Sequence, residues 1–245
     1  KGATILNGKA IIKFLVVIAA IIGLFAYFIQ PLAGSLKQGL DLQGGTHIVL
    51  EAEDSATGTA DNDAVERAKQ ILERRINEMG LSEPLVQREG ARRIIIELPG
   101  VKDPDEAIKR IGKTAVLEFK NDQGQTVMTG DDLKDAKEEL GQNKQPLVAI
   151  ELSDEGAKKF ADLTSKNIGR RIAITLDGKE LTNPVVQQAI TGGKATISGS
   201  QSLEEAKDLA ILLRSGALPV KINVLEVRTV GPSLGQDSKD KSVVA

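Results

Sequence analysis

The chain has 245 residues, enough for one large domain or two small domains with cores of their own. Its 32 basic and 34 acidic side chains give a net charge of −2, which counts against the basic groove of a nucleic-acid-binding protein. It has no cysteine and one histidine, His47. These counts exclude a disulfide framework, a thiol nucleophile, a cysteine-ligated metal and a multi-histidine metal site.

The first patterned segment is apolar. No charged residue occurs from Phe14 to Ile29, and with residues 10–12 the segment reaches about 20 residues, the length that spans a bilayer. Lysines and no acidic residues precede it, which by the positive-inside rule places the N-terminus in the cytoplasm. We therefore expect a cytoplasmic segment 1–9, a transmembrane helix 10–29 and an extracytoplasmic remainder. A cleaved signal peptide is the alternative, but this segment is longer than the usual signal-peptide core.

Residues 40–119 alternate between strand and helix patterns. An amphipathic helix is predicted at 63–80, where Val65, Ala68, Leu72 and Ile76 share one face. A second, short helix follows Asp103, a good N-cap residue. The predicted elements are a strand at 40–52, the helix at 63–80, strands at 85–88 and 92–98, the helix at 104–111 and a strand at 115–119. This β-α-β-β-α-β order is typical of a ferredoxin-like unit in an α+β fold.

A polar, glycine-containing stretch at 121–130 suggests a subdomain boundary. A capping box at Ser202 and Glu205 marks the start of the last predicted helix. The other predictions are a polar helix at 131–140, a strand at 146–152, a helix after Ser153, a strand at 171–176, a turn at 177–178, a segment at 184–190, a turn at 191–193, a strand at 195–197, the helix at 203–215, a strand at 220–228 and a polar tail at 233–245.

Three stretches together resemble one family. They are Gly-Leu-Asp-Leu-Gln-Gly-Gly at 39–45, the segment 184–199 with Thr-Gly-Gly at 191–193, and the segment 212–237 with Gly-Pro-Ser-Leu-Gly at 231–235. In this order, behind an apolar segment, they are similar to the SecD family, membrane subunits of the bacterial Sec protein-export machinery related to RND-type transporters. The resemblance covers nearly the whole chain.

The resemblance implies an extracytoplasmic domain with a base near the membrane and a head that contacts emerging polypeptide. It assigns the base to residues 36–119 plus 218–232 and the head to residues 120–217. It further implies action with SecF and the proton-motive force in the bacterial cytoplasmic (inner) membrane. The implied partners are SecF, the SecYEG channel, a YajC-like accessory subunit, unfolded exported polypeptides and membrane lipid, and no nucleic acid.

In the family the Gly-Pro-Ser-Leu-Gly motif leads into a second membrane span and, in later spans, an acidic residue that handles protons. Here it leads into Ser-Lys-Asp-Lys-Ser at 238–242. We therefore expect a fragment or a truncated, separately encoded version of the subunit that does not conduct protons by itself.

The motif residues favour structural roles. A lone carboxylate at Asp41 lacks the partner that acid–base catalysis requires, and adjacent glycines suit a close approach of two backbones. His47 is interpreted as an ordinary half-exposed strand residue rather than a catalytic or pH-sensing group. The tips at 177–178 and 191–193 are interpreted as hairpin turns. The residues assigned to family motifs, as structural or hinge positions, are Asp41, Leu42, Gln43, Gly44, Gly45, Gly192, Gly193, Gly216, Gly231, Pro232 and Gly235.

An unfolded client offers backbone groups and apolar side chains, so its expected site is an apolar groove or an exposed strand edge. The candidate contacts are Phe160, Ile172, Ile174, Val185 and Val186. We expect no catalytic residue, cofactor or metal, because no phosphate-binding loop and no nucleophile motif is present. The favoured function is a non-enzymatic export subunit whose domain swings on boundaries near 121–124 and 215–216. A single-span, membrane-anchored binding or scaffold module without motor activity is the alternative, and an envelope hydrolase is disfavoured.

Overall fold

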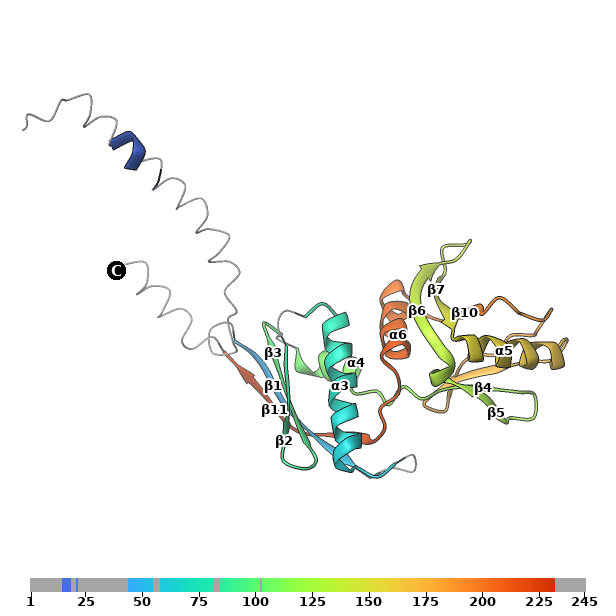
Figure 1. The fold of residues 1–245 in the computed structure, drawn as a ribbon, viewed down its shortest axis with the longest axis horizontal. Coiled ribbons are helices and arrows are strands. Elements are labelled where there is room, and N and C mark those ends of the chain that lie inside the picture. The colour runs from blue at the N-terminus through green and yellow to red at the C-terminus, as the bar shows by residue number, and fades with distance from the viewer. Residues whose placement is uncertain are drawn as a thin grey trace, which may run out of the picture. The chain divides into compact units, whose positions relative to one another are not determined.

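The computed structural model describes residues 15–18, 21, 44–54, 58–81, 84–101 and 103–231 (Figure 1). The chain divides into two compact units, residues 1–38 and 39–245. In the first unit residues 15–18 and 21 are helical, and the rest of the predicted span at 10–29 lies outside the described residues. No helix within the described residues is long and apolar enough to cross a membrane. All elements below belong to the second unit.

One part of the second unit, here termed the base, is a four-stranded antiparallel sheet with two helices. Its strands lie in the order β11-β1-β3-β2. The bounds are β1 Gly45–Glu53, α3 Asn62–Glu78, β2 Leu85–Glu89, β3 Arg93–Pro99, α4 Pro104–Ile111 and β11 Lys221–Val230. Helix α3 begins after Asp61, whose carboxylate accepts a 2.7 Å hydrogen bond from the Ala64 amide, and α4 begins after Asp103 with proline in its first turn.

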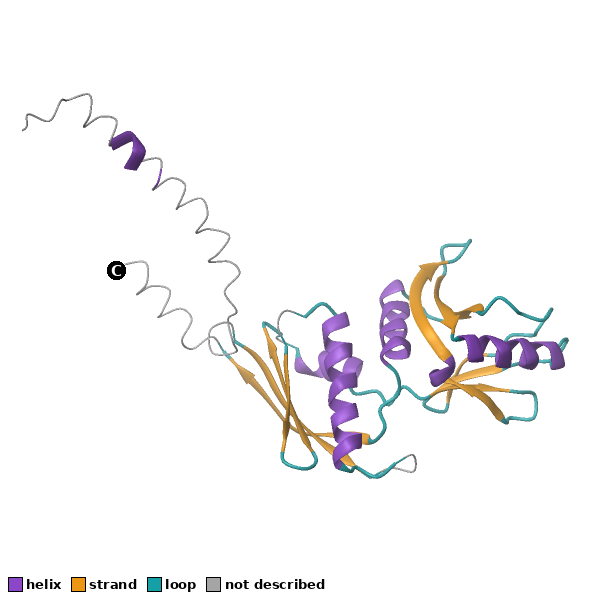
Figure 2. Cartoon of the chain, viewed as in Figure 1, coloured by secondary structure: helices purple, strands orange, loops and turns teal. Residues whose placement is uncertain are grey.

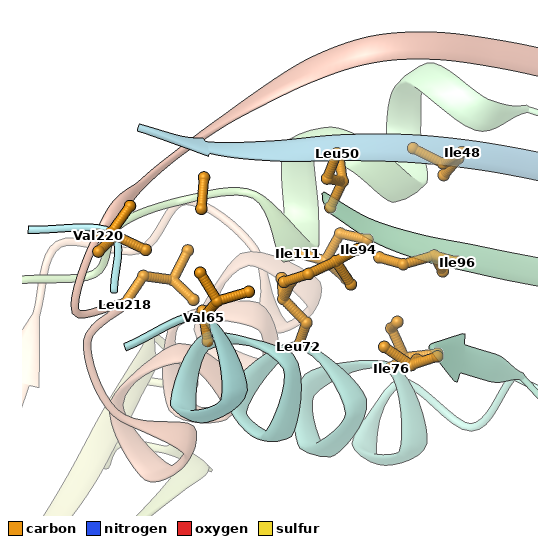
Figure 3. Close-up of a cluster of buried hydrophobic side chains, with 14 of the residues drawn as sticks. Ile48, Leu50, Val65, Leu72, Ile76, Ile94, Ile96, Ile111, Leu218 and Val220 are labelled. Atoms are coloured by element: carbon orange, nitrogen blue, oxygen red, sulfur yellow. The ribbon is translucent and has the colours of Figure 1, made fainter. Parts of the chain in front are cut away.

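The base has a purely aliphatic core, formed where α3 and α4 face the sheet (Figure 3). The sheet contributes every second residue of its strands, as a pleated strand with one buried face requires. Burying each Ile or Leu stabilises the fold by about 1.5–3 kcal/mol. The core residues labelled in Figure 3 are Ile48, Leu50, Val65, Leu72, Ile76, Ile94, Ile96, Ile111, Leu218 and Val220.

The other part, here termed the head, lies between α4 and β11 in sequence and has two antiparallel sheets, ordered β10-β7-β6 and β5-β4-β8-β9. Its core holds Phe119 and Phe160, whose rings meet edge to face with centroids 6.0 Å apart. The bounds are β4 Leu117–Lys120, β5 Thr126–Thr129, η1 Gly130–Asp132, β6 Leu133–Leu140, β7 Pro146–Leu152, α5 Asp154–Lys166, β8 Ala173–Leu176, β9 Lys179–Thr182, β10 Lys194–Ser198 and α6 Leu203–Ser215.

The α+β class is confirmed, but one strand belongs to a different sheet than expected. The strand predicted at 115–119 is β4, which pairs with β5 and β8 in the head. The base sheet contains β11, from the segment 218–232 that was assigned to the base, and β11 pairs with β1 from Gly45 to Glu53. The expectation that this strand completes the base sheet is therefore corrected, whereas the domain boundary at residue 119 stays a prediction. A local strand pattern does not specify its partner, because the partner is chosen by packing across the whole chain.

The polar helix predicted at 131–140 is wrong. Residues 130–132 form a single 3-10 turn and residues 133–140 form β6, which pairs with β7 along its length. Figure 2 shows that strands make up much of the head. The lysine- and glutamate-rich sequence of β6 has good helix propensity, yet strand pairing overrides it. Two short strands were also missed, β5 within the polar break and β9 after the turn at 177–178.

Candidate functional site

The glycine pair at 44–45 lies where three strands of the base meet. Gly45 pairs with Pro99 of β3 and with Val230 of β11. Its φ is +151°, and a Cβ atom there would lie 2.3 Å from the carbonyl oxygen of Leu98. Only glycine fits here, so the close approach of two strands explains why the motif has a glycine at this position. Asp41, Leu42 and Gln43 lie outside the described residues, as do Pro232 and Gly235.

The other motif glycines occupy loop positions. Gly193 precedes β10, and its carbonyl accepts a 2.8 Å hydrogen bond from the Leu152 amide. Gly192 belongs to the same turn, and Gly231 directly follows β11. Gly216 caps the end of α6. Their roles as structural or hinge residues stay predictions.

His47 is a partly exposed residue of β1. Its Nδ1 atom lies 3.5 Å from Oε1 of Glu97 on the neighbouring strand β3, and 27% of its side chain is exposed. This placement agrees with an ordinary strand residue. Within the described residues, no group of three or more His, Asp or Glu side chains is arranged to hold a metal ion.

The candidate polypeptide contacts are mostly inside the head. Phe160, Ile172, Ile174 and Val186 are at most 8% exposed and belong to its core cluster. Val185, at 46%, is exposed. Four of the five therefore present little surface to a polypeptide, and contact through Val185 stays a prediction.

Two chain crossovers join the base to the head, at residues 112–116 and 216–219. They run side by side, since the Leu218 amide donates a 2.8 Å hydrogen bond to the Thr114 carbonyl. Each crossover leads from one core to the other: Leu117 is buried in the head core, whereas Leu218 is buried in the base core. The two crossovers and the side chains that bind them are termed the junction below.

A buried arginine of the base ties both crossovers together. Arg75 of α3 is fully buried, and its Nε donates to Ser215 Oγ at 3.1 Å. Its Nη1 donates to the carbonyl oxygens of Ile111, at 2.6 Å, and Lys113, and its Nη2 donates to that of Gly216 at 2.8 Å. Ile111 ends α4 and Gly216 caps α6, so the guanidinium meets the negative ends of two helices.

Burial costs this guanidinium part of its hydration, which lowers the pKa of Arg75 to about 10. The group is still charged at neutral pH. Its hydrogen-bond acceptors are three backbone carbonyls and a hydroxyl, all of them neutral. Backbone dipoles therefore hold this charge, and the nearby carboxylate of Asp177 also favours it, without accepting a hydrogen bond from Arg75 that the structure shows.

Two further arginines link base and head nearer the surface. Arg110 of α4 binds Asp208 of α6, with its Nε 2.9 Å from Oδ1. Arg214 of α6 binds Glu78 of α3 through Nε at 2.9 Å and Nη2 at 2.8 Å. The hydrogen bonds that Arg110 donates to Asp208 and that Arg214 donates to Glu78 raise the pKa of each arginine. These two contacts are termed the outer ion pairs.

A groove of about 640 Å³ lies beside the junction. Its apolar lining comes from the base, through Leu50, Ile108, Ile111, Ile222 and Val224. Helix α6 of the head contributes acidic side chains to the same groove. The groove is therefore lined by both the base and the head.

Arg75 was not singled out from the sequence, although a signal exists. It lies three residues after Leu72 and seven after Ala68, both in the apolar stripe of the predicted helix. A residue at these spacings falls on the buried face. An arginine there indicates a charged group held by specific acceptors inside the protein.

Family models match three parts of the chain. "SecD/SecF GG Motif" matches residues 36–56, "Protein translocase subunit SecDF, P1 domain, N-terminal" matches 65–124, and "SecDF, P1 head subdomain" matches 108–220. A solved structure described as a membrane component SecDF that enhances protein export is 40% identical, with a TM-score of 0.67, and the match covers 74% of this chain and 99% of that one. The chain belongs to the SecD family of protein translocase subunits.

Other SecD relatives agree. The protein translocase subunit SecD of Acidaminococcus fermentans is 58% identical over 95% of this chain and 56% of its own length. The SecDF of Thermus thermophilus is 43% identical over 85% of this chain and 33% of its own. A solved SecDF in a super-membrane-facing form has a TM-score of 0.73 at 41% identity, covering 85% of this chain and 33% of that one. This SecD chain spans about half the length of the curated SecD relatives it matches.

Proposed function

We propose that this chain is the first extracytoplasmic domain, with its membrane anchor, of a non-enzymatic SecD subunit that assists protein export. Membership of the SecD family carries the proposal, together with the relative described as enhancing protein export. The domain would bind polypeptide emerging from the SecYEG channel and, with SecF, a YajC-like subunit and the proton-motive force, promote its forward movement. The subunit would lie in the cytoplasmic membrane of a bacterium, with this domain outside.

The base, in this proposal, is a ferredoxin-like unit into which the head is inserted. The strand order β11-β1-β3-β2 with two helices supports that classification. The head would swing against the base at the junction. Two separate cores joined by two short crossovers support this division.

The contacts at the junction suggest which parts move. Arg75 holds both crossovers against the base, so rotation would take place on their head side, beyond Lys113 and Gly216. The outer ion pairs would break during the swing, because each joins a base helix to α6. Gly216, with a φ of +87°, tolerates the backbone change that a hinge needs.

A reversible cross-link across the junction tests the swing. Glu78→Cys with Arg214→Cys replaces an outer ion pair whose Oε2 and Nη2 atoms are 2.8 Å apart. The complete subunit with both changes is placed in cells that lack their own copy and treated with a reducible bismaleimide. Maturation of a pulse-labelled precursor should slow after cross-linking and recover after reduction. Residues 1–245 contain no cysteine, and any cysteine elsewhere in the complete subunit is replaced by serine first.

The matched control lies wholly within the head. Lys134→Cys with Glu151→Cys replaces an ion pair of similar length, 2.6 Å from Nζ to Oε1, between β6 and β7. Cross-linking this pair should leave export unchanged. If a verified cross-link at 78 and 214 also leaves export unchanged, the swing is refuted and a passive scaffold module is favoured.

A further inference from the structure

The described part of the chain has six sheet edges, and one of them differs from the rest. Strand β11 is 10 residues long, pairs with β1 alone, and exposes Val224, Leu225 and Val227 at 42%, 47% and 37%. The edges β2, β5, β9 and β10 have five residues or fewer. Edge β6 has eight, of which Lys134, Asp135, Lys137, Glu138 and Glu139 are charged. Short length and charge protect edges from unwanted pairing. Strand β11 is long, and its charged residues Glu226 and Arg228 pair with each other, so the segment around Val224 and Leu225 has neither protection.

The β11 edge is also irregular. Its pairing with β1 shifts between Val49 and Leu50, so that Leu225 is an extra residue without a partner on β1. Such a bulge bends the strand and increases its twist. A flat, rigid sheet edge fits a bent edge poorly, whereas a flexible extended chain adapts to it.

The apolar groove at the junction opens along this edge. Val224 and Ile222 of β11 line it, together with Ile108 and Ile111 of α4. Val224 pairs with Leu50, so it points to the face of the sheet that carries the helices. A strand added to β11 directs every second side chain to that same face.

We propose that β11 and this groove bind a segment of unfolded polypeptide in transit, as an added strand whose alternate apolar side chains enter the groove. The proposal rests on the proposed function and assigns a contact surface to it on the base. Main-chain hydrogen bonds to this edge, which is unpaired among the described residues, supply affinity, and the groove selects apolar side chains.

The charges around the groove favour this occupant over a partner of fixed sequence. Three basic side chains and three acidic ones line it, so their formal charges cancel: Lys109, Arg110, Lys113, Glu106, Glu204 and Asp208. A balanced rim gives no strong preference for the charge of the ligand. Recognition then depends on backbone and apolar groups, which every unfolded client has.

The groove also couples binding to the position of the head. Glu204 and Asp208 belong to α6, and Asp208 holds Arg110 across the groove. A polypeptide in the groove therefore contacts both halves of the molecule, and its occupancy depends on their orientation.

The binding test uses the full chain in lipid nanodiscs and a fluorescent peptide of about eight residues with alternating Val and Thr, the length of a typical strand. A second peptide has the same side chains but carries N-methyl groups on alternate amides, which removes those donors. By fluorescence anisotropy the methylated peptide should bind about tenfold more weakly or worse. Equal binding of the two peptides would overturn the proposal. This comparison uses the unaltered chain and needs no folded variant.

Two matched substitutions locate the site. Val224→Lys places a charge on the β11 edge, and Val127→Lys places the same charge on head strand β5, where the parent valine is 41% exposed against 42% for Val224. Circular dichroism and the unfolding temperature show whether each variant is folded. Val224→Lys should weaken peptide binding about tenfold and Val127→Lys should not. Equal effects, or no effect of Val224→Lys in a folded variant, would overturn the proposal.

Photo-cross-linking in the complete subunit distinguishes the occupants. A benzophenone amino acid at Leu225 should capture an arrested export intermediate, whereas one at Leu140, an exposed leucine of β6, should not. Capture of a second copy or of another membrane subunit in place of the intermediate would overturn the inference. If Val224→Lys abolished peptide binding but export stayed normal, this inference would also be overturned. The proposed function would still stand, because the cross-link at 78 and 214 tests it separately.

Discussion

The centre of the junction and its periphery use the same side chain in two different ways. At the centre, Arg75 is fully buried and binds neutral oxygens of both crossovers, at Lys113 and Gly216. At the periphery, Arg110 and Arg214 keep 24% and 31% of their side chains exposed and bind carboxylates. The central contacts are shielded from water and salt, whereas the peripheral pairs can exchange with both.

This difference separates a permanent contact from a breakable one. Removing a buried donor leaves its acceptors without water or any other partner, so the contact is expensive to lose. A partly exposed ion pair regains hydration when it opens, and its net contribution is small. A hinge needs both kinds of contact, a fixed attachment for the crossovers and weak contacts that open during rotation.

The largest effect is expected from Arg75→Met. The substitution removes the donor of three carbonyls and of the Ser215 hydroxyl, which keeps only its bond to the Leu212 carbonyl, and the free energy of unfolding should fall by about 3–5 kcal/mol. Guanidinium denaturation of the full chain measures it. Arg74→Met, at an exposed position one residue earlier in α3, is the control and should change stability by less than about 0.5 kcal/mol. Equal effects would show that Arg75 contributes no more than a surface residue.

A smaller loss of stability is expected from Arg75→Lys, with a distinct effect on geometry. Lysine retains the charge but lacks the planar fork that reaches both crossovers at once. Stability should lie between that of the parent and that of Arg75→Met. Distances between spin labels on α4 and β7 should spread over a wider range than in the parent. An unchanged distribution would mean that the fork does not fix the orientation of the head.

The outer ion pairs should each contribute about 1 kcal/mol, and less at high salt. Glu78→Gln removes the carboxylate that binds Arg214, and Asp208→Asn removes the one that binds Arg110. Their effects on unfolding should add, and both should shrink in about 1 M salt, where screening acts within about 3 Å. The loss caused by Arg75→Met should persist in the same salt. If the loss of stability caused by Arg75→Met disappeared in high salt, the central and peripheral contacts would not differ in the way described.

The smallest effect concerns a titratable acceptor inside the head, in contrast to the neutral acceptors of Arg75. Hydrogen bonds from Lys120 and Thr126 hold the pKa of Glu118 below its ordinary value of 4.5. The unfolded chain therefore takes up the proton first, and the stability from this group is lost as the pH falls below about 4.5. Glu118→Gln should flatten the acid limb of the stability curve, and Glu139→Gln, on the exposed edge β6, should not.

Local patterns predicted the base well because its elements are regular. The stripe from Val65 to Ile76 identified α3, and Asp103 with Pro104 identified the start of α4. The alternation of Ile94, Ile96 and Leu98 identified β3. These signals arise within one helix turn or one strand repeat, so the sequence is sufficient to read them.

The head was predicted less well for the opposite reason. The charged sequence of β6 resembles a solvated helix, and only its pairing with β7 makes it a strand. An apolar residue can belong to the core or to a binding surface, and the sequence does not distinguish the two. The structure places the candidate contacts Phe160 and Ile174 in the core. Whether an apolar residue is buried depends on what packs against it.

By itself the sequence determined the α+β fold class and the order of the helices and strands in the base up to α4. It also identified the glycine pair at 44–45, where the backbone must come close to a neighbouring strand. Membership of the SecD family rests on motifs of consecutive residues, which need no folding to be recognised. Only the tertiary structure placed β4 in a head sheet, and brought Arg75 to Lys113 and Gly216 of the two crossovers, which are 38 and 141 residues away in sequence. Contacts over such separations follow from the packing of whole elements, for which no local pattern encodes the partner.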